Sequence, residues 1–294
     1  MLSFVTWNVS PEIFTLGGFS LRYYSAFFAI GFVLAYFVIK HYYKQENIPQ
    51  KELDRLTVFV VLGGILGARI GHCVFYEPSY FLTREHWMEM ILPFSFGPFR
   101  FTGFQGLASH GGAIGVLLAV FIFKFRSKQD GFWAIMDKIV IPTGFVGALI
   151  RFGNLMNSEI YGYPADLPWG FLFVRNGDTL PCHPTQIYEA LCYIVVSIVL
   201  ILLYRKPKYA RMHGLMLGVF LIMVFSARFF IEFLKQNQES FEQGMALNMG
   251  QILSIPAVIG GIALVIYAFR KNGGCKKEVH NYKFKNNNGC HSAN

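Results

Sequence analysis

The sequence carries little charge for its length. Only 15% of its 294 residues are charged, whereas 54% are hydrophobic. The mean hydropathy is +0.41, and the 31 Phe and 15 Tyr residues suit lipid contact and the aromatic belts of membrane interfaces. This composition argues against a soluble globular domain and predicts an integral membrane protein with one domain.

Cysteine is scarce as well, and its five occurrences form no CxxC pair. A disulfide framework or a zinc site is therefore not expected. The net charge is +9, but the basic residues occupy short loops between apolar runs, which indicates membrane topology and not a nucleic-acid partner. Residues 1–18 also lack the basic start and apolar core of a cleaved signal peptide, so the first apolar run is expected to direct insertion.

The apolar runs predict an all-α polytopic membrane protein with seven transmembrane helices over residues 24–270. The spans are expected at about residues 24–40, 56–76, 110–125, 132–150, 187–204, 215–234 and 251–269. The second span carries a face of small residues, Gly63, Gly64, Gly67 and Gly71, which permits close contact with another helix.

The segments between the spans predict smaller units. Residues 1–23 alternate around Gly17-Gly18 and are expected to form an external arm with a small β-hairpin. Residues 77–108 are expected to form an external loop with a short interfacial helix at about 80–90. Residues 160–187, in which Asn176-Gly177 is a hairpin signal, are expected to form a small β-containing external head. Residues 271–294 have the composition of a disordered tail.

Lysine and arginine predict the orientation of these spans. They gather at the ends that follow the first, third, fifth and seventh spans. The positive-inside rule then places the N-terminus outside and the C-terminus in the cytoplasm. In a bacterial cell the protein would lie in the inner membrane, with the end of the fourth span facing outward.

A polar stretch follows the fourth span. It reads Arg151-Phe152-Gly153-Asn154-Leu155-Met156-Asn157-Ser158-Glu159-Ile160-Tyr161-Gly162. A charged side chain at bilayer depth costs about 2.5–3.5 kcal/mol on insertion scales, so it needs a partner or a function. If the stretch is helical, Arg151, Asn154 and Ser158 lie on one face. Such a face suits a phosphate headgroup.

Other polar residues at the span ends each have a structural and a functional interpretation. His110 begins the third span and is followed by two glycines. It is either an interfacial side chain or a group that an approaching substrate can reach, because the glycines leave room. His183 precedes a helix start. Pro184 and Glu189 are common near a helix N-terminus, so this segment fits a structural interpretation as well as a functional one. Arg228 and Glu232 are an i,i+4 pair that either neutralises itself or brings a second arginine to the phosphate. Two more residues, Tyr24 and Arg69, fit interfacial and structural roles.

These segments together resemble the bacterial prolipoprotein diacylglyceryl transferase family. Residues Arg151 to Glu159 with Gly162 match the family signature G-R-x-G-N-x-x-N-x-E-x-x-G, except that Ile150 stands at its first glycine. The supporting blocks occur in the family's order: Gly67-Ala68-Arg69-Ile70-Gly71, Ser109-His110-Gly111-Gly112, His183-Pro184-Thr185-Gln186-Ile187-Tyr188-Glu189, Arg228-Phe229-Phe230-Ile231-Glu232-Phe233 and Met249-Gly250-Gln251-Ile252-Leu253-Ser254. The resemblance covers residues from about 20 to 270.

The resemblance implies a transferase that moves the diacylglyceryl group of phosphatidylglycerol to the lipobox cysteine of a preprolipoprotein. A thioether forms and glycerol phosphate leaves. The implied partners are phosphatidylglycerol, lipobox signal peptides and membrane lipids, with no nucleic acid and no metal or organic cofactor. Because thiols are mostly protonated at neutral pH, a base assists the attack. Arginine suits the developing phosphate charge.

On this basis we expect Arg151 and Arg228 to bind the phosphate, with Asn154 as a further donor, His110 as the base and Glu232 orienting Arg228. The remaining expected substrate-site residues are Tyr24, Asn157, Glu159, Gly162 and His183. One alternative is a lipid or small-anion transporter, although the sequence lacks the internal repeats common in transporters. Another is a membrane scaffold without catalysis. A covalent product would separate the enzyme from both.

Overall fold

The computed structural model describes residues 4–17, 19–83, 86–92, 94–96, 99–101, 106, 108–127, 131–236 and 245–273. Within them, six helices are long and apolar enough to cross a membrane. They are α1 (Tyr23–Gln45), α2 (Gln50–Phe75), α5 (Phe132–Met156), α6 (Thr185–Tyr204), α8 (Leu215–Ile231) and α9 (Met249–Gly273). The protein is therefore a multi-pass membrane protein. Most of the predicted tail, from residue 274 on, lies outside the described residues.

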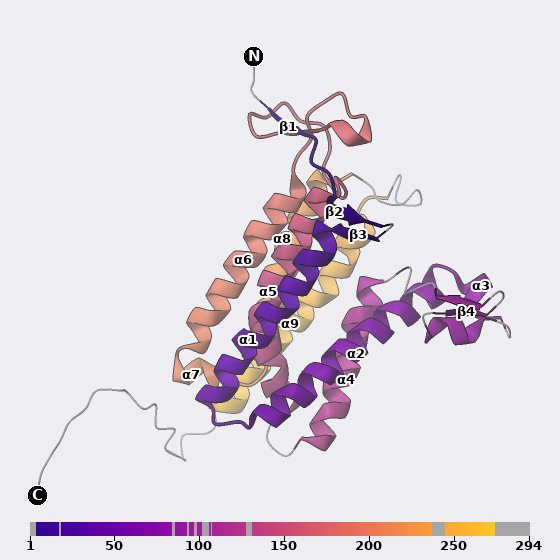
Figure 1. Ribbon diagram of the computed structural model, residues 1–294. Helices are drawn as coiled ribbons and strands as arrows, with labels where there is room; N and C mark the ends of the chain where they lie inside the picture. The colour runs from indigo at the N-terminus through magenta and orange to yellow at the C-terminus, as the bar shows by residue number, and fades with distance from the viewer. Residues whose placement is uncertain are drawn as a thin grey trace, which may run out of the picture.

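The third predicted span, residues 110–125, corresponds to α4 (Ser109–Arg126, 18 residues), which is not among those six helices. The seven-span count therefore remains a prediction. Helix α4 packs along α2, and the two form a pair beside the bundle of α1, α5, α6, α8 and α9 (Figure 1).

Glycine explains how closely α2 and α4 pack. A Cβ atom at Gly67 would overlap the carbonyl oxygen of Gly111, and one at Gly115 would overlap the carbonyl oxygen of Gly63. Because no side chain larger than hydrogen fits at these positions, the two backbones are in direct contact. The prediction of a close-packing face at residues 63–71 is confirmed.

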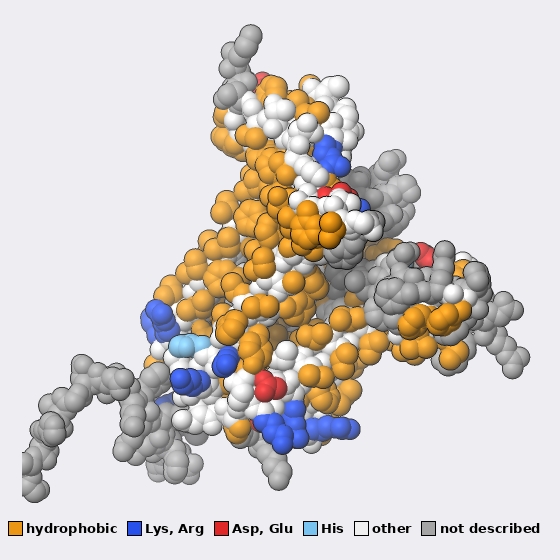
Figure 2. Space-filling model, viewed as in Figure 1, with side chains coloured by type: hydrophobic (Ala, Val, Ile, Leu, Met, Phe, Trp, Pro, Cys, Tyr) orange, Lys and Arg blue, Asp and Glu red, His pale blue; other side chains and the backbone are white. Residues whose placement is uncertain are grey.

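The main bundle has an apolar core and an apolar surface. Ile135, Ile141, Leu200 and Met216 are almost completely buried in the core. Large hydrophobic side chains also cover much of the outside of the helices (Figure 2). Helices that are apolar on all sides are typical of a membrane span.

Short strands lie at the end of the bundle where α1 and α6 begin (Figure 1). Strands β2 (Glu12–Leu16) and β3 (Phe19–Arg22) form the antiparallel hairpin predicted around the glycine pair. Strand β1 (Val5–Trp7) pairs in parallel with β6 (Phe171–Phe173), and the indole of Trp7 donates a hydrogen bond to the carbonyl oxygen of Leu155 at 3.0 Å. This last contact ties the start of the chain to the end of α5.

Two local predictions were wrong. Asn176-Gly177 does not form a tight hairpin: β6 pairs with the distant β1, and the short helix η2 (Val174–Asn176) follows it, with Gly177 at φ +77°. The single helix expected at residues 80–90 is replaced by α3 (Pro78–Phe81) and η1 (Trp87–Met90), followed by the strands β4 (Phe94–Phe96) and β5 (Phe99–Phe101). The remaining short elements are α7 (Pro207–Ala210) and η3 (Glu232–Leu234).

Candidate functional site: a charged cluster at one end of the bundle

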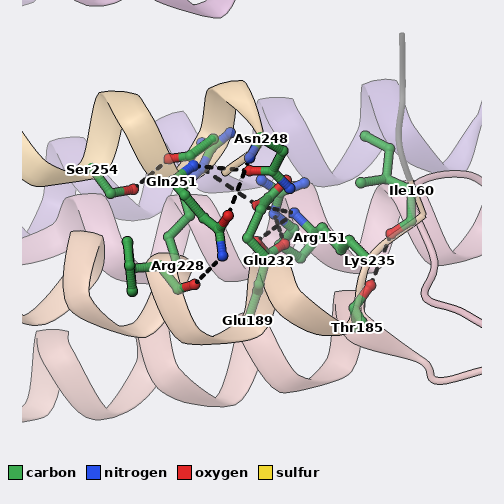
Figure 3. A network of polar contacts seen from close by, with 12 residues as sticks. Arg151, Ile160, Thr185, Glu189, Arg228, Glu232, Lys235, Asn248, Gln251 and Ser254 are labelled. Atoms are coloured by element: carbon green, nitrogen blue, oxygen red, sulfur yellow. Dashed lines mark hydrogen bonds and ion pairs between the residues drawn. The ribbon is translucent and has the colours of Figure 1, made fainter. Parts of the chain in front are cut away.

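Five charged side chains meet at the end of the bundle that lies nearest β2 and β3. Arg151 comes from the last turns of α5, Glu189 from the first turns of α6 and Arg228 from the last turn of α8. Glu232 begins η3, and Lys235 follows it. Figure 3 shows these side chains directed toward one another between the helices. We call these five residues the charged cluster.

The charges in the cluster alternate. Arg151 Nε lies 2.6 Å from Glu189 Oε2, and Lys235 Nζ lies 2.8 Å from Glu189 Oε1. The same ammonium lies 3.3 Å from Glu232 Oε2, and that oxygen is 3.9 Å from Arg228 Nε. Glu189, Lys235 and Glu232 are 0%, 2% and 6% exposed. Buried charges require partners, and each of these three has two.

Arg228 is the most loosely held member of the cluster. Its side chain is 28% exposed, compared with 14% for Arg151. Among the described residues its guanidinium makes no hydrogen bond, and its ion pair with Glu232 is long, at 3.9 Å. A planar guanidinium carries five N–H donors, so most of the binding capacity of Arg228 is available to another molecule.

The start of α9 contacts the carboxylate of Glu232. A Cβ atom at Gly250 would lie 2.6 Å from Glu232 Cδ, so glycine allows this close approach. Asn248 caps the helix: its side chain accepts a hydrogen bond from the Gln251 backbone at 2.9 Å, and the Gln251 side chain accepts one from the Asn248 backbone at 3.1 Å. The positive end of the helix dipole favours the negative charge of Glu232.

The polar stretch at residues 151–162 is only partly helical. Arg151 and Asn154 share a face, and Arg151 Nη1 donates to Asn154 Oδ1 at 3.3 Å. Helix α5 ends at Met156, however, and Ser158 has a φ of +56°. Ser158 therefore lies outside the helix, and its predicted place on the same face was wrong.

Glu159 and Asn157 extend this hydrogen-bonded chain toward solvent. The amide of Asn154 donates to Glu159 Oε1 at 2.7 Å, and the amide of Asn157 donates to the same oxygen at 3.1 Å. Glu159 is exposed. Tyr24, at the start of α1, packs against this segment, because a Cβ atom at Gly153 would lie 2.8 Å from Tyr24 Cδ2.

Gly162 permits a close backbone crossing. Its N–H donates to the carbonyl oxygen of His183 at 2.9 Å, and a Cβ atom there would overlap the carbonyl oxygen of Leu234 and lie 2.7 Å from His183 Cβ. Gly162 also forms an antiparallel bridge with Lys235. This crossing fixes the backbone that carries Lys235.

Two predicted histidines lie apart from the charged cluster. His183 Nδ1 lies 3.3 Å from the hydroxyl of Tyr188, and burial lowers the pKa of His183 below its usual value. His110 is exposed in the first turn of α4 and makes no hydrogen bond to the described residues. Arg69, which had a structural interpretation, is buried, donates to the carbonyl oxygen of Glu89 at 3.1 Å and lies over the ring of Phe81.

The importance of two cluster members was not recognised from the sequence. Glu189 was explained as an ordinary residue at a helix start, and Lys235 was not among the expected site residues. Lys235 stands three residues after Glu232, however, and residues at that spacing lie on one helical face. Glu232 therefore has two basic partners at helical spacing, Arg228 four residues before it and Lys235 three residues after it. This pattern was the sequence signal for the site.

The chain matches the family model described as "Prolipoprotein diacylglyceryl transferase" over residues 11–267. A relative from Bacteroides fragilis, named phosphatidylglycerol–prolipoprotein diacylglyceryl transferase, is 42% identical over 92% of this chain and 98% of its own length. Relatives of the same name come from Porphyromonas gingivalis (41% identical, 91% of this chain and 96% of the relative) and from Tolumonas auensis (40% identical, 90% of this chain and 98% of the relative).

Proposed function

Because the chain belongs to the prolipoprotein diacylglyceryl transferase family, we propose that the charged cluster is where it holds phosphatidylglycerol during catalysis. The protein is a transferase that moves the diacylglyceryl group to prolipoproteins. The relatives support this activity and give no support to the transporter interpretation. What remains to be assigned is the part that each residue plays.

The loosely held guanidinium of Arg228 is the observation that carries this assignment. It lies beside the partly buried Arg151 with most of its donors unused. Two guanidinium groups on neighbouring helices suit the oxygens of a phosphodiester, because each presents a planar fork of N–H donors. Arg228 and Arg151 therefore bind the phosphate, and Asn154 and Glu232 position them.

The reaction makes one bond and breaks one. The thiolate sulfur of the lipobox cysteine attacks the glycerol carbon that is joined to phosphate, and a carbon–sulfur bond forms. The carbon–oxygen bond breaks, and its electron pair leaves with glycerol phosphate. The negative charge that develops on the leaving group is stabilised by Arg228 and Arg151, which hold these positions before the reaction starts.

His110 takes the thiol proton. It belongs to the α2–α4 pair and not to the bundle that carries the charged cluster. A peptide that enters beside this pair would bring its cysteine to an exposed imidazole on one side and to the bound lipid on the other. The substrate site is completed by Asn157, Glu159 and Gly162 of the polar stretch and by Tyr24 and His183, which pack against that stretch.

The protein lies in the bacterial inner membrane, with its N-terminus outside and its C-terminus in the cytoplasm. Lys and Arg side chains gather at the end of the bundle remote from the charged cluster (Figure 2), which supports this orientation by the positive-inside rule. Helix α4 is the third span in chain order and brings the number of spans to seven. Its 18 residues extend about 27 Å at 1.5 Å per residue, close to the thickness of the hydrocarbon core.

A lipobox peptide, incubated with purified protein and phosphatidylglycerol and analysed by mass spectrometry, tests this function. A diacylglyceryl adduct on the cysteine and released glycerol phosphate are expected. The Arg228→Ala variant should make no adduct while accumulating normally. The Arg270→Ala variant, changed in the last turns of α9, is the matched control and should retain full activity. Normal turnover by Arg228→Ala would exclude the phosphate-binding role, and bound lipid without any adduct would favour a transporter.

A further inference from the structure

Lys235 has no part in the proposed catalytic steps, yet it is the most completely enclosed cation of the cluster. We propose that Lys235 is a positioning residue that determines donor specificity: it balances one carboxylate, so that the cluster keeps one uncompensated positive charge for a lipid headgroup with a single net negative charge. This inference rests on the proposed function, because it concerns the choice of donor lipid at the same site.

The charge balance of the cluster supports this role. Arg151, Arg228 and Lys235 supply three positive charges, and Glu189 and Glu232 supply two negative charges. The third nearby carboxylate, Glu159, is exposed and reaches the cluster only through the amide of Asn154. Water and salt screen an exposed charge far more than a buried one. One positive charge of the cluster therefore remains without a buried partner.

The geometry assigns that excess charge to Arg228. The ammonium of Lys235 contacts both carboxylates, at 2.8 Å from Glu189 and 3.3 Å from Glu232. With Lys235 in place, Glu232 is already neutralised and holds Arg228 only at 3.9 Å. Without it, two carboxylates would face two guanidinium groups, the cluster would be neutral, and Glu232 would compete with the lipid phosphate for Arg228.

The backbone keeps Lys235 in this position. Its N–H donates to the carbonyl oxygen of Glu232 at 3.2 Å, and the residue forms a bridge with Gly162. The N–H of Tyr163 donates to the preceding carbonyl oxygen, that of Leu234, at 2.9 Å. A compact ammonium with three donors suits a site between two carboxylate oxygens. Lys235 is therefore held by backbone contacts on one side and by two carboxylates on the other, and its ammonium group stays buried.

The expected consequence is discrimination between donor lipids. Phosphatidylglycerol carries one negative charge and no positive charge. Phosphatidylethanolamine has the same phosphodiester but adds an ammonium group, which the excess positive charge of the cluster repels. A neutral cluster would lose this preference, because it would neither attract the first headgroup nor repel the second.

The test compares Lys235→Met, which keeps the length of the side chain and removes the charge, with Lys235→Arg, which keeps the charge. The KM for phosphatidylglycerol, the KM for a lipobox peptide and inhibition by phosphatidylethanolamine are measured in mixed micelles of constant surface charge. We expect Lys235→Met to raise the KM for phosphatidylglycerol about tenfold, the effect of one weakly screened charge nearby, and to strengthen inhibition by phosphatidylethanolamine. The KM for the peptide should not change, and Lys235→Arg should behave as wild type.

A second pair of variants keeps the test decisive if Lys235→Met accumulates poorly. Glu189→Gln leaves three positive charges against one negative charge, whereas Lys235→Met combined with Glu189→Gln leaves two against one. We expect the single variant to have the lower KM for phosphatidylglycerol. Equal KM values in this pair, an unchanged lipid preference in Lys235→Met, or an equal rise of both its KM values would overturn the inference. Wild-type protein that forms no adduct would instead refute the proposed function.

Discussion

Arg151 Nε lies 2.6 Å from Glu189 Oε2, and this ion pair joins the last turns of α5 to the first turns of α6. Glu189 has no exposed surface and holds Lys235 with its other oxygen. The pair therefore does two things: it positions one guanidinium of the charged cluster, and it connects three segments of the chain, α5, α6 and the residues after η3. The position of Arg151 and the stability of the folded protein therefore both depend on the Glu189 carboxylate.

Replacing Glu189 by Ala should destabilise the protein strongly. The change leaves Arg151 and Lys235 without their buried partner, and breaking a buried pair costs about 3–5 kcal/mol. Thermal unfolding in detergent measures the effect. The control is Glu52→Ala: Glu52 pairs with Arg55, the two side chains are 16% and 53% exposed, and a pair that reaches solvent contributes less than about 1 kcal/mol. Equal losses in the two variants would contradict a structural role for the cluster.

Replacing His110 by Gln should slow transfer strongly. A positioned general base contributes about 10²–10⁴-fold to the rate. The variant should therefore lose a factor of that order in the rate of adduct formation. Initial rates of adduct formation between pH 5 and 9 provide the comparison. His41→Gln, changed at an exposed histidine near the end of α1, should retain the wild-type profile. A wild-type rate in His110→Gln across this range would remove His110 as the base.

His183 should make the protein less stable in acid. Burial lowers the pKa of His183 below its usual value of 6.5, so the folded protein binds the proton less readily than the unfolded chain does. The stability that neutral His183 contributes is full above about pH 6.5 and is lost as the pH falls through the lowered pKa. The unfolding temperature of wild type should therefore fall more between pH 7 and pH 5 than that of His183→Phe. Parallel curves would show that the histidine is not responsible.

Replacing Gly115 by Ala should force α4 away from α2. The added Cβ atom would overlap the carbonyl oxygen of Gly63, and overpacking of this kind costs about 1–3 kcal/mol. A lower unfolding temperature and slower transfer are expected, because His110 lies on the displaced helix. Gly260→Ala is the matched control, since a Cβ atom there would meet no atom of a neighbouring segment within 4 Å. Unaltered stability in Gly115→Ala would mean that the helix pair adjusts without strain.

Local patterns predicted the parts of the fold that local physics determines. The apolar runs indicated the long helices, and the Gly17-Gly18 pair marked the β2–β3 hairpin. The shared face of Arg151 and Asn154 followed from helical spacing alone. The left-handed backbone at Ser158 was not predicted, because only glycine signals that conformation clearly and serine adopts it under tertiary contacts.

Long-range contacts were beyond the local patterns. Strands β1 and β6 have three residues each and pair across most of the chain, so neither run is long enough to mark its partner. The Asn176-Gly177 hairpin was predicted wrongly for the same reason. Lys235 and Glu189 form one site only once α6 and α8 pack together, which no window of the sequence contains.

The bond from the Trp7 indole to Leu155 has a consequence for biosynthesis. Leu155 directly follows Asn154 of the polar stretch, and β1 pairs with a strand beyond it. During translation, β1 must therefore wait until α5 and β6 have been synthesised before its partners exist. The order of assembly is the reverse of the order of synthesis at this point. A bulky fusion at the N-terminus would therefore hinder the docking of β1 onto β6. A purification tag is better placed at the C-terminus.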